Sequence, residues 1–279
     1  MKSEVWSRAA LAAVLGGSVI LGGCQYIRPK KPELAYVERP VEALYQEGAS
    51  RLDRRQWEQA VIYFREVERQ HPYSEWSRRA ILMTAYANYQ ASNYAEAIAA
   101  ADRFIQLYPG NPSTPYAYYL RAQCYWEQIV DVGRDQSATN QALIAYREVV
   151  QRYPNTDYAA DARLKIDTVN DQLAGKEMTI GRYYLRNGQP IAAMGRFKAV
   201  IDRYQTTSHV QEALYRMVEA SITLGLFDEA KRNAAVLGAN YPGGAWYNGA
   251  YKLMTSRGLR PAVVPEGQRK GILDRLRIG

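Results

Sequence analysis

Apolar residues recur along most of the chain with the spacing of amphipathic helices. Five segments each carry an alanine, a second residue of the same face four positions later, and an apolar residue three positions after that. The alanines are Ala60, Ala97, Ala142, Ala193 and Ala230; the second positions are Phe64, Ala101, Tyr146, Phe197 and Ala234; the third are Val67, Phe104, Val149, Val200 and Leu237. Spacings of three, four and seven residues keep these side chains on one helical face. The pattern predicts five helices that repeat one design.

The same marks stand before and after each of these helices. Twelve residues after the alanine come Pro72, Pro109, Pro154, Gln205 and Pro242, and twelve residues before it come Gly48, Ala85, Val130, Gly181 and Val218. Small residues at the earlier position let a second helix approach closely. Paired helices with these marks are the tetratricopeptide (TPR) pattern. We therefore predict an all-α TPR solenoid of five helix pairs, with a C-terminal capping helix in "GAWYNGAYKLMTSRG" that covers the last repeat.

Two of the units are longer than the others. The third contains a polar, turn-forming stretch at residues 130–141, which we predict to be an insertion between its helices. The fourth begins with residues 157–188, where apolar positions recur helically and no proline intervenes. This segment predicts one helix of about 30 residues, about 45 Å long, that joins two halves of the solenoid. Gly175 is its expected weak point.

The first residues have the features of a cleaved export signal. Lys2 and Arg8 precede an uncharged run, and Leu-Gly-Gly then leads to Cys24. The uncharged run has about 12 residues, fewer than the roughly 20 that a membrane-spanning helix needs. Leu-Gly-Gly-Cys resembles a bacterial lipobox, which implies cleavage before Cys24 and its lipidation; an ordinary secretory peptide is the alternative. Gln25, which is not Asp, favours an outer-membrane, periplasm-facing location over inner-membrane retention.

These observations divide the chain into five parts. They are a signal peptide (1–23), a proline-containing extended tether (24–40), an N-terminal half with three repeats (41–156), a C-terminal half with the long helix, two repeats and the cap (157–259), and a basic tail (260–279). The tail carries apolar residues among Arg and Lys. It therefore has two alternative structures, a short amphipathic helix or a frayed end.

Charge and side-chain chemistry narrow the class of function. The formal net charge is +8, and removal of Lys2, Glu4 and Arg8 with the signal lowers it to +7. A periplasmic location argues against nucleic acid, so anionic lipid or acidic protein surfaces are the expected partners. His71 and His209 lie far apart without ligands at metal-binding spacing, and Cys124 falls within a helical run. No catalytic or nucleotide-binding motif is present, so we predict no enzyme, no cofactor and no metal.

Three segments resemble one family more specifically than the repeat consensus does. They are "ADRFIQLYPGNPSTPYAYYLRA" (101–122), "GRDQSATNQALIAYREVVQRYPNTDYAADA" (133–162) and "DQLAGKEMTIGRYYLRNG" (171–188). With the lipobox they resemble the BamD (ComL) family, lipoproteins of the outer-membrane β-barrel assembly machinery. The resemblance implies a non-enzymatic scaffold. Its first three repeats would receive the C-terminal targeting strand of an unfolded barrel protein, and its later repeats would dock on the last POTRA domain of BamA and on BamC. Two features depart from the family. They are the tail after Arg260 and the missing proline at Gln205.

The repeat positions also select candidate binding residues. In a TPR solenoid the inward positions of each first helix select Tyr45, Arg79, Tyr86, Tyr89, Tyr119, Gln123 and Trp126 in the N-terminal half. Aromatic rings give a large contact area with few torsions to fix, and Arg79 is suited to a terminal carboxylate through a bidentate bond. We expect a peptide groove here, although packing between repeats is an equal alternative for any single ring.

In the C-terminal half the same positions select Glu212, Tyr215, Glu219 and Ile222, and Arg216 and Arg232 join them as partner-interface candidates. Charged rims set register and association rate at interfaces, while a solvated face is the alternative. For the whole protein, the alternative function is that of a periplasmic TPR adaptor lipoprotein for peptidoglycan hydrolases, of the NlpI kind.

Overall fold

The computed structural model describes residues 33–131 and 134–260. The predicted signal peptide, Cys24 and most of the basic tail lie outside these residues. Within them the chain folds into eleven helices and no strand. The helices are α2 (Val41–Asp53), α3 (Trp57–Gln70), α4 (Glu75–Gln90), α5 (Tyr94–Leu107), α6 (Thr114–Trp126), α7 (Ser137–Arg152), α8 (Asp157–Arg186), α9 (Pro190–Arg203), α10 (Val210–Thr223), α11 (Phe227–Asn240) and α12 (Ala245–Thr255).

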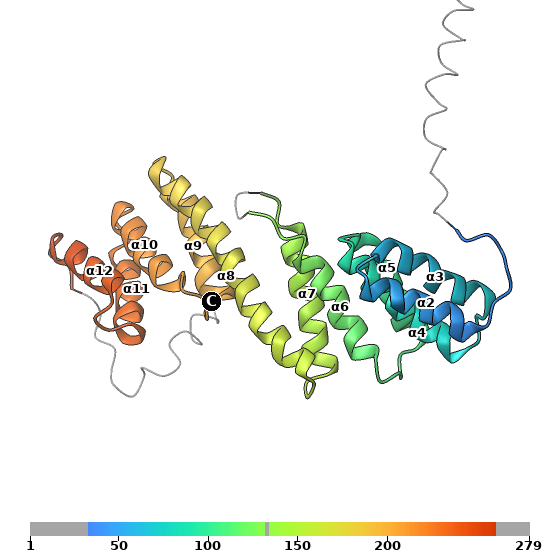
Figure 1. Cartoon of the computed structure of the whole chain (residues 1–279). Helices are drawn as coiled ribbons and strands as arrows, with labels where there is room; N and C mark the ends of the chain where they lie inside the picture. The colour runs from blue at the N-terminus through green and yellow to red at the C-terminus, as the bar shows by residue number, and fades with distance from the viewer. Residues whose placement is uncertain (1–32, 132–133, 261–279) are drawn as a thin grey trace, which may run out of the picture.

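Successive helices pack side by side into an elongated array (Figure 1). The pairs are α2–α3, α4–α5, α6–α7, the C-terminal part of α8 with α9, and α10–α11. First helices of neighbouring pairs also touch, α2 with α4, α4 with α6 and α6 with α8. The terminal helix α12 packs on α10 and α11. The predicted all-α TPR solenoid with a capping helix is confirmed.

The small residues at the helix crossings have the predicted role. A Cβ atom on Gly48 would lie 2.8 Å from Phe64 Cε1, and one on Gly181 would lie 2.5 Å from Phe197 Cε1. Real Cβ atoms do not approach other atoms so closely, because packed interiors have no spare volume. Glycine at these two positions therefore allows each phenylalanine of the second helix to pack against the first.

The third repeat differs from the sequence prediction. Val130 is 38% exposed and follows the end of α6, so it does not serve as the small residue of this pair. Ala122 is fully buried, in the cluster that contains Tyr146, and takes that place. The count back from Ala142 fails because the connection between α6 and α7 lengthens the spacing. This connection is residues 127–136, since α7 already begins at Ser137.

Helix α8 is 30 residues long, as predicted, and it runs through the middle of the molecule (Figure 1). The Thr156 side chain caps its N-terminus by accepting a hydrogen bond from the Ala159 backbone N–H at 3.2 Å. The helix continues through Gly175, where a Cβ would lie 3.3 Å from His209 Nε2. Gly175 thus gives room to His209 rather than ending the helix.

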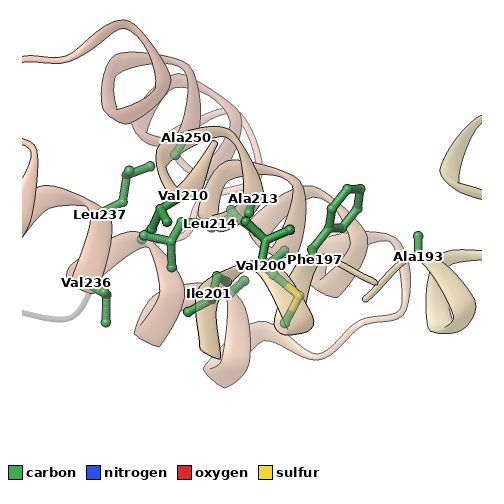
Figure 2. Close-up of a cluster of buried hydrophobic side chains, with 14 of the residues drawn as sticks. Ala193, Phe197, Val200, Ile201, Val210, Ala213, Leu214, Val236, Leu237 and Ala250 are labelled. Carbon is green, nitrogen blue, oxygen red and sulfur yellow. The ribbon is translucent and has the colours of Figure 1, made fainter. Parts of the chain in front are cut away.

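The largest hydrophobic cluster lies in the C-terminal half. It joins α8 through α12 with residues such as Phe197, Leu214 and Leu237, each fully buried. Figure 2 shows Phe197, Val200, Leu214 and Leu237 lying together in this cluster. Separate clusters fill the first three repeats, the fully buried Phe64, Phe104 and Tyr146 among their residues. Each repeat thus buries apolar surface against its neighbours, which is how a solenoid gains stability.

The end of the predicted tether is held by the first repeat. Residues 33–40 form no helix, and backbone atoms of Leu34, Val37 and Arg39 hydrogen-bond to side chains at the end of α3. Contacts with the first repeat therefore begin at Leu34, inside the predicted tether of residues 24–40.

Candidate functional site

The seven residues predicted for the groove fall into two groups. Tyr45 and Arg79 lie between the first two repeats, and Tyr89, Tyr119, Gln123 and Trp126 lie around the third repeat and the start of α8. Tyr86 is half-buried and packs against the clusters of both the first and the second repeat. The first helices that carry all seven pack against one another, so the two groups belong to one side of the array.

The first group combines a cation with two aromatic rings. The Tyr45 ring centroid lies 4.9 Å from that of Trp76 and 5.4 Å from that of Phe64. Arg79 Cζ lies 5.4 Å from the Trp76 centroid, within the range of a cation–π contact. Arg79 is exposed, and no carboxylate pairs with it among the residues that the structure describes. Its guanidinium donors are therefore available to an incoming anion.

The second group is a chain of hydrogen bonds. The Tyr146 hydroxyl donates to Gln123 Oε1 at 2.9 Å, Gln123 Nε2 donates to the Tyr119 hydroxyl, and the Tyr119 hydroxyl donates to Asp161 Oδ2 at 2.6 Å. Trp126 packs edge-on against Tyr146, with centroids 6.2 Å apart. The chain connects α6, α7 and α8, and it satisfies these polar groups within the protein.

Burial raises the pKa values of four tyrosines in this region. It raises the pKa of Tyr89 to about 12, assisted by the negative charge of Glu127. It is also the main cause of the raised pKa of Tyr116, Tyr119 and Tyr146. Removing a hydroxyl proton would create a poorly solvated anion, so these groups stay neutral at ordinary pH. Tyr89, Tyr119 and Tyr146 act as hydrogen-bond donors.

Three residues of these groups were missed by the sequence reasoning. The Trp76 ring makes the cation–π contact with Arg79. The ring centroids of Tyr158 and Tyr119 lie 5.3 Å apart, and Asp161 accepts a hydrogen bond from the Tyr119 hydroxyl. A sequence signal existed for two of them, Tyr158 and Asp161. Tyr158 and Asp161 lie four and seven residues after Pro154, the same spacing that places Trp76 and Arg79 after Pro72. Treating the long helix as a connector left these inward positions out.

In the C-terminal half, four of the six candidates form one cluster on α10. Arg216 Nη1 lies 2.8 Å from Glu219 Oε2, and its Nε lies 3.3 Å from Glu212 Oε1. Arg216 Cζ also lies 5.4 Å from the Tyr215 centroid and 5.9 Å from that of Trp246. Burial alone would lower the pKa of Arg216, but the bonds and charges of Glu219 and Glu212 outweigh it and raise that pKa. Arg216 therefore stays charged and fully engaged.

A hollow lies beside this cluster. It has a volume of about 560 Å³ and is lined by residues of α8 and α10, among them Arg182, Arg186, Arg216 and Glu219. A second hollow of about 840 Å³ shares Leu185 and Glu219 with it and extends toward the α8–α9 turn. The C-terminal half thus offers a charged surface next to a mostly apolar depression.

The remaining two candidates lie apart from the cluster. Ile222 is 9% exposed and belongs to the hydrophobic core, because α10 turns this side chain toward its neighbours. The structure therefore does not place Ile222 among the residues free to contact a partner. Arg232 is exposed on α11, where it pairs with Glu229 one turn earlier.

The described residues contain little that suggests catalysis. They hold no group of three or more His, Cys, Asp or Glu side chains arranged to bind a metal ion. Cys124 is buried, and burial raises the pKa of its thiol to about 12, which keeps it in the unreactive protonated form. In the same part of the chain, no helix has both the length and the apolar character to cross a bilayer.

Stacked helix pairs with small residues at their crossings define a TPR solenoid, a class of repeat protein with an extended concave surface. Residues 37–237 match the YfiO family, described as outer membrane lipoprotein. A Caulobacter vibrioides protein named outer membrane protein assembly factor BamD is 66% identical over 95% of this chain and 87% of its own length. Proteins of the same name from Rickettsia prowazekii and Neisseria meningitidis are 46% and 36% identical, covering 88% and 72% of this chain and 96% and 79% of their own lengths. The chain belongs to the BamD family of outer membrane protein assembly factors.

Among solved structures, the TPR2AB-domain–pHSP90 complex of yeast Sti1 is similar at a TM-score of 0.40. It is 11% identical and covers 85% of this chain and 96% of its own. Such a likeness is too low to carry an argument about the site.

Proposed function

We propose that this protein is a lipid-anchored, non-enzymatic scaffold of outer-membrane β-barrel assembly, facing the periplasm. In this proposal the surface at Arg79 holds the C-terminal strand of an unfolded barrel protein. The α10 surface docks on the POTRA domain of BamA and on BamC. Family membership supports the general role in assembly, and the geometry of the two surfaces supports the division of labour between them.

The observation that carries the client-binding part is the open guanidinium of Arg79. It rests on the Trp76 ring beside Tyr45, and no carboxylate pairs with it within the described chain. A polypeptide that ends in an aromatic residue offers the two complementary groups, a ring for the aromatic platform and a carboxylate for the guanidinium. A bidentate bond between guanidinium and carboxylate fixes the end of the chain in register.

The test is a titration with a peptide that ends in Phe, carried out with the wild-type protein and the Arg79→Ala variant. The variant should bind about 10- to 100-fold more weakly, since hydrogen bonds between charged groups contribute about 1.5–3 kcal/mol. Amidating the peptide's C-terminus should weaken binding to the wild type to the same extent and leave binding to Arg79→Ala unchanged. If amidation weakens both equally, Arg79 does not hold the carboxylate.

The docking part is tested by reversing one charge on α10. Glu219→Arg places a positive charge beside Arg216 at the edge of both hollows, so it should reduce co-purification of the large β-barrel partner after mild detergent extraction. Glu58→Arg, the same reversal at an exposed glutamate of α3 in the N-terminal half, is the matched control and should retain the partner. Equal retention by both variants would remove the α10 surface from the proposal.

The anchor is tested by metabolic labelling with a fatty acid. The wild-type protein should incorporate the label, and Cys24→Ser should not. Label that persists in Cys24→Ser would show that the acyl chains are attached elsewhere.

A further inference from the structure

The last part of the N-terminal segment forms a strap, residues 33–40, on the end of α3. The Arg39 backbone N–H donates to Gln70 Oε1 at 3.0 Å, and Gln70 Nε2 donates to the Val37 carbonyl at 2.9 Å. His71 Nε2 lies 2.9 Å from the Arg39 carbonyl oxygen, and Arg69 Nη2 donates to the Leu34 carbonyl at 3.3 Å. These contacts use backbone atoms along the whole strap, so they fix its path.

The α3 residues that hold the strap are themselves fixed. Glu66 is 4% exposed, and its carboxylate accepts hydrogen bonds from both Arg69 and Gln70. Burial raises the pKa of Glu66, but these hydrogen bonds outweigh it and hold that pKa below its usual range. Arg69 Cζ also lies 5.2 Å from the centroid of Tyr36, a strap residue. The strap therefore lies on a prearranged surface.

The strap and the neighbouring α3–α4 turn expose apolar and aromatic side chains, and the strap also exposes the acidic Glu33 and Glu38. Tyr36 is 67% exposed, Val37 is 53% exposed, and Tyr73 is completely exposed. Tyr73 follows His71, the strap's contact in the α3–α4 turn, by two residues. Figure 1 shows the strap, in blue, passing round the outer end of the first helix pair. Three exposed apolar side chains at one end of the molecule are a typical composition for a surface that contacts lipid headgroups, where tyrosine is enriched.

The length of chain before the strap decides what can cover this surface. Only eight residues stand between Cys24 and Glu33, and a chain of this length spans at most roughly 30 Å. Three of the eight, Arg28, Lys30 and Lys31, are basic and are attracted to anionic lipid. If Cys24 carries the acyl chains, the strap cannot lie farther than this from the bilayer surface.

We propose that Tyr36, Val37 and Tyr73 form a second membrane contact, which seats the first helix pair on the lipid surface. This inference rests on the anchor at Cys24 in the proposed function. Its consequence is that the N-terminal repeat has a set orientation to the membrane, rather than moving freely on a tether.

The experiment uses the full, acylated protein in vesicles of phosphatidylethanolamine and phosphatidylglycerol, with a quencher attached to lipid headgroups. Tyr73→Cys is labelled with an environment-sensitive dye, and Cys124 is spared because it is buried. The matched control is Tyr251→Cys, an exposed tyrosine of α12 at the other end of the solenoid. Quenching should be severalfold stronger at position 73. Equal quenching at both positions would overturn the inference. That result is also the one expected if Tyr73 contacts another protein and not lipid.

A second variant tests whether the patch itself makes the contact. Val37→Asp in the labelled protein should lower quenching at position 73 severalfold, because it places a negative charge against anionic lipid while its backbone carbonyl still accepts from Gln70. Val130→Asp, at an exposed valine far along the chain, should not. Quenching that Val37→Asp leaves unchanged would contradict the proposal.

The mass of the protein and its flotation with vesicles separate the two proposals. An acylated, floating protein without quenching at position 73 refutes the second contact alone. A protein that is not acylated refutes the anchor, and this inference with it.

Discussion

Arg79 and Arg216 occupy comparable surroundings in the two halves of the solenoid. Each lies on the first helix of a repeat, and each guanidinium carbon lies 5.4 Å from an aromatic centroid, Trp76 for Arg79 and Tyr215 for Arg216. They differ in their anions. Arg216 pairs with Glu212 and Glu219, whereas no carboxylate pairs with Arg79 within the described residues. Arg216 is thus paired within the protein, and Arg79 keeps its guanidinium donors unpaired by any carboxylate of the described chain.

This difference has a physical meaning. A paired guanidinium in a half-buried place fixes the side chains around it, and removing it leaves carboxylates without their partner. An exposed guanidinium on a ring adds little to stability, but it retains its full capacity for bonding an anion. The comparison therefore indicates that Arg216 stabilises its surroundings, and it supports the proposal that Arg79 binds an anion.

The largest expected effect on stability tests this contrast directly. Arg216→Ala should lower the free energy of unfolding by about 2 kcal/mol, because Glu219 loses its partner and Glu212 keeps only Arg182. Arg79→Ala should change it by less than about 0.5 kcal/mol. Urea unfolding followed by circular dichroism measures both. If the two variants unfold at the same urea concentration, the distinction between engaged and open cations does not hold.

A smaller effect should come from the hydrogen-bond chain of the third repeat. Tyr119→Phe removes the donor to Asp161, so the free energy of unfolding should fall by about 1–2 kcal/mol. Tyr89→Phe is the control, since its hydroxyl makes a 3.3 Å bond to the exposed Glu127 and should matter less. The same urea titration applies. A result in which both variants match the wild type would show that engaged polar groups in the N-terminal half do not stabilise it.

The smallest effect is a dependence on alkaline pH. Burial raises the pKa of Tyr89 to about 12, so the folded protein favours its neutral form. The associated stability is fully present below the ordinary tyrosine pKa of about 10 and is lost as pH rises through about 12. Tyr89→Phe should therefore flatten the fall in the urea midpoint over this range. Arg216 keeps its charge there, so Arg216→Ala should leave the fall unchanged. If Tyr89→Phe does not alter the fall in the urea midpoint, other titrating groups cause that fall.

Much of the fold could be predicted from the sequence, because it depends on contacts between residues close in the chain. The five helix pairs follow from the alanine-centred spacing, and the 30-residue α8 follows from an apolar period without a proline. The small residue of the third repeat could not be found in this way. The connection between α6 and α7 shifts the count, so Ala122 and not Val130 lies at the crossing.

The candidate surfaces were predicted only in part. Repeat positions found Arg79 and three members of the α10 cluster, Glu212, Tyr215 and Glu219. They also selected Ile222, which the packing of α10 buries. Asp161 went unselected because the long helix was treated as a connector, and only the structure shows its hydrogen bond to Tyr119, 42 positions earlier. Position in a repeat indicates which way a side chain points, and it does not indicate whether another side chain already fills the space.

The sequence by itself determined the helices, their pairing and the family, since local periodicity and short motifs carry that information. Only the tertiary structure decided which charged groups are already paired, which rings are covered and where the N-terminal strap lies. The physical reason is that pairing and burial depend on distances between helices that are separated in the chain. A few ångströms of such distance decide whether a guanidinium meets a carboxylate of its own protein or stays open to another molecule.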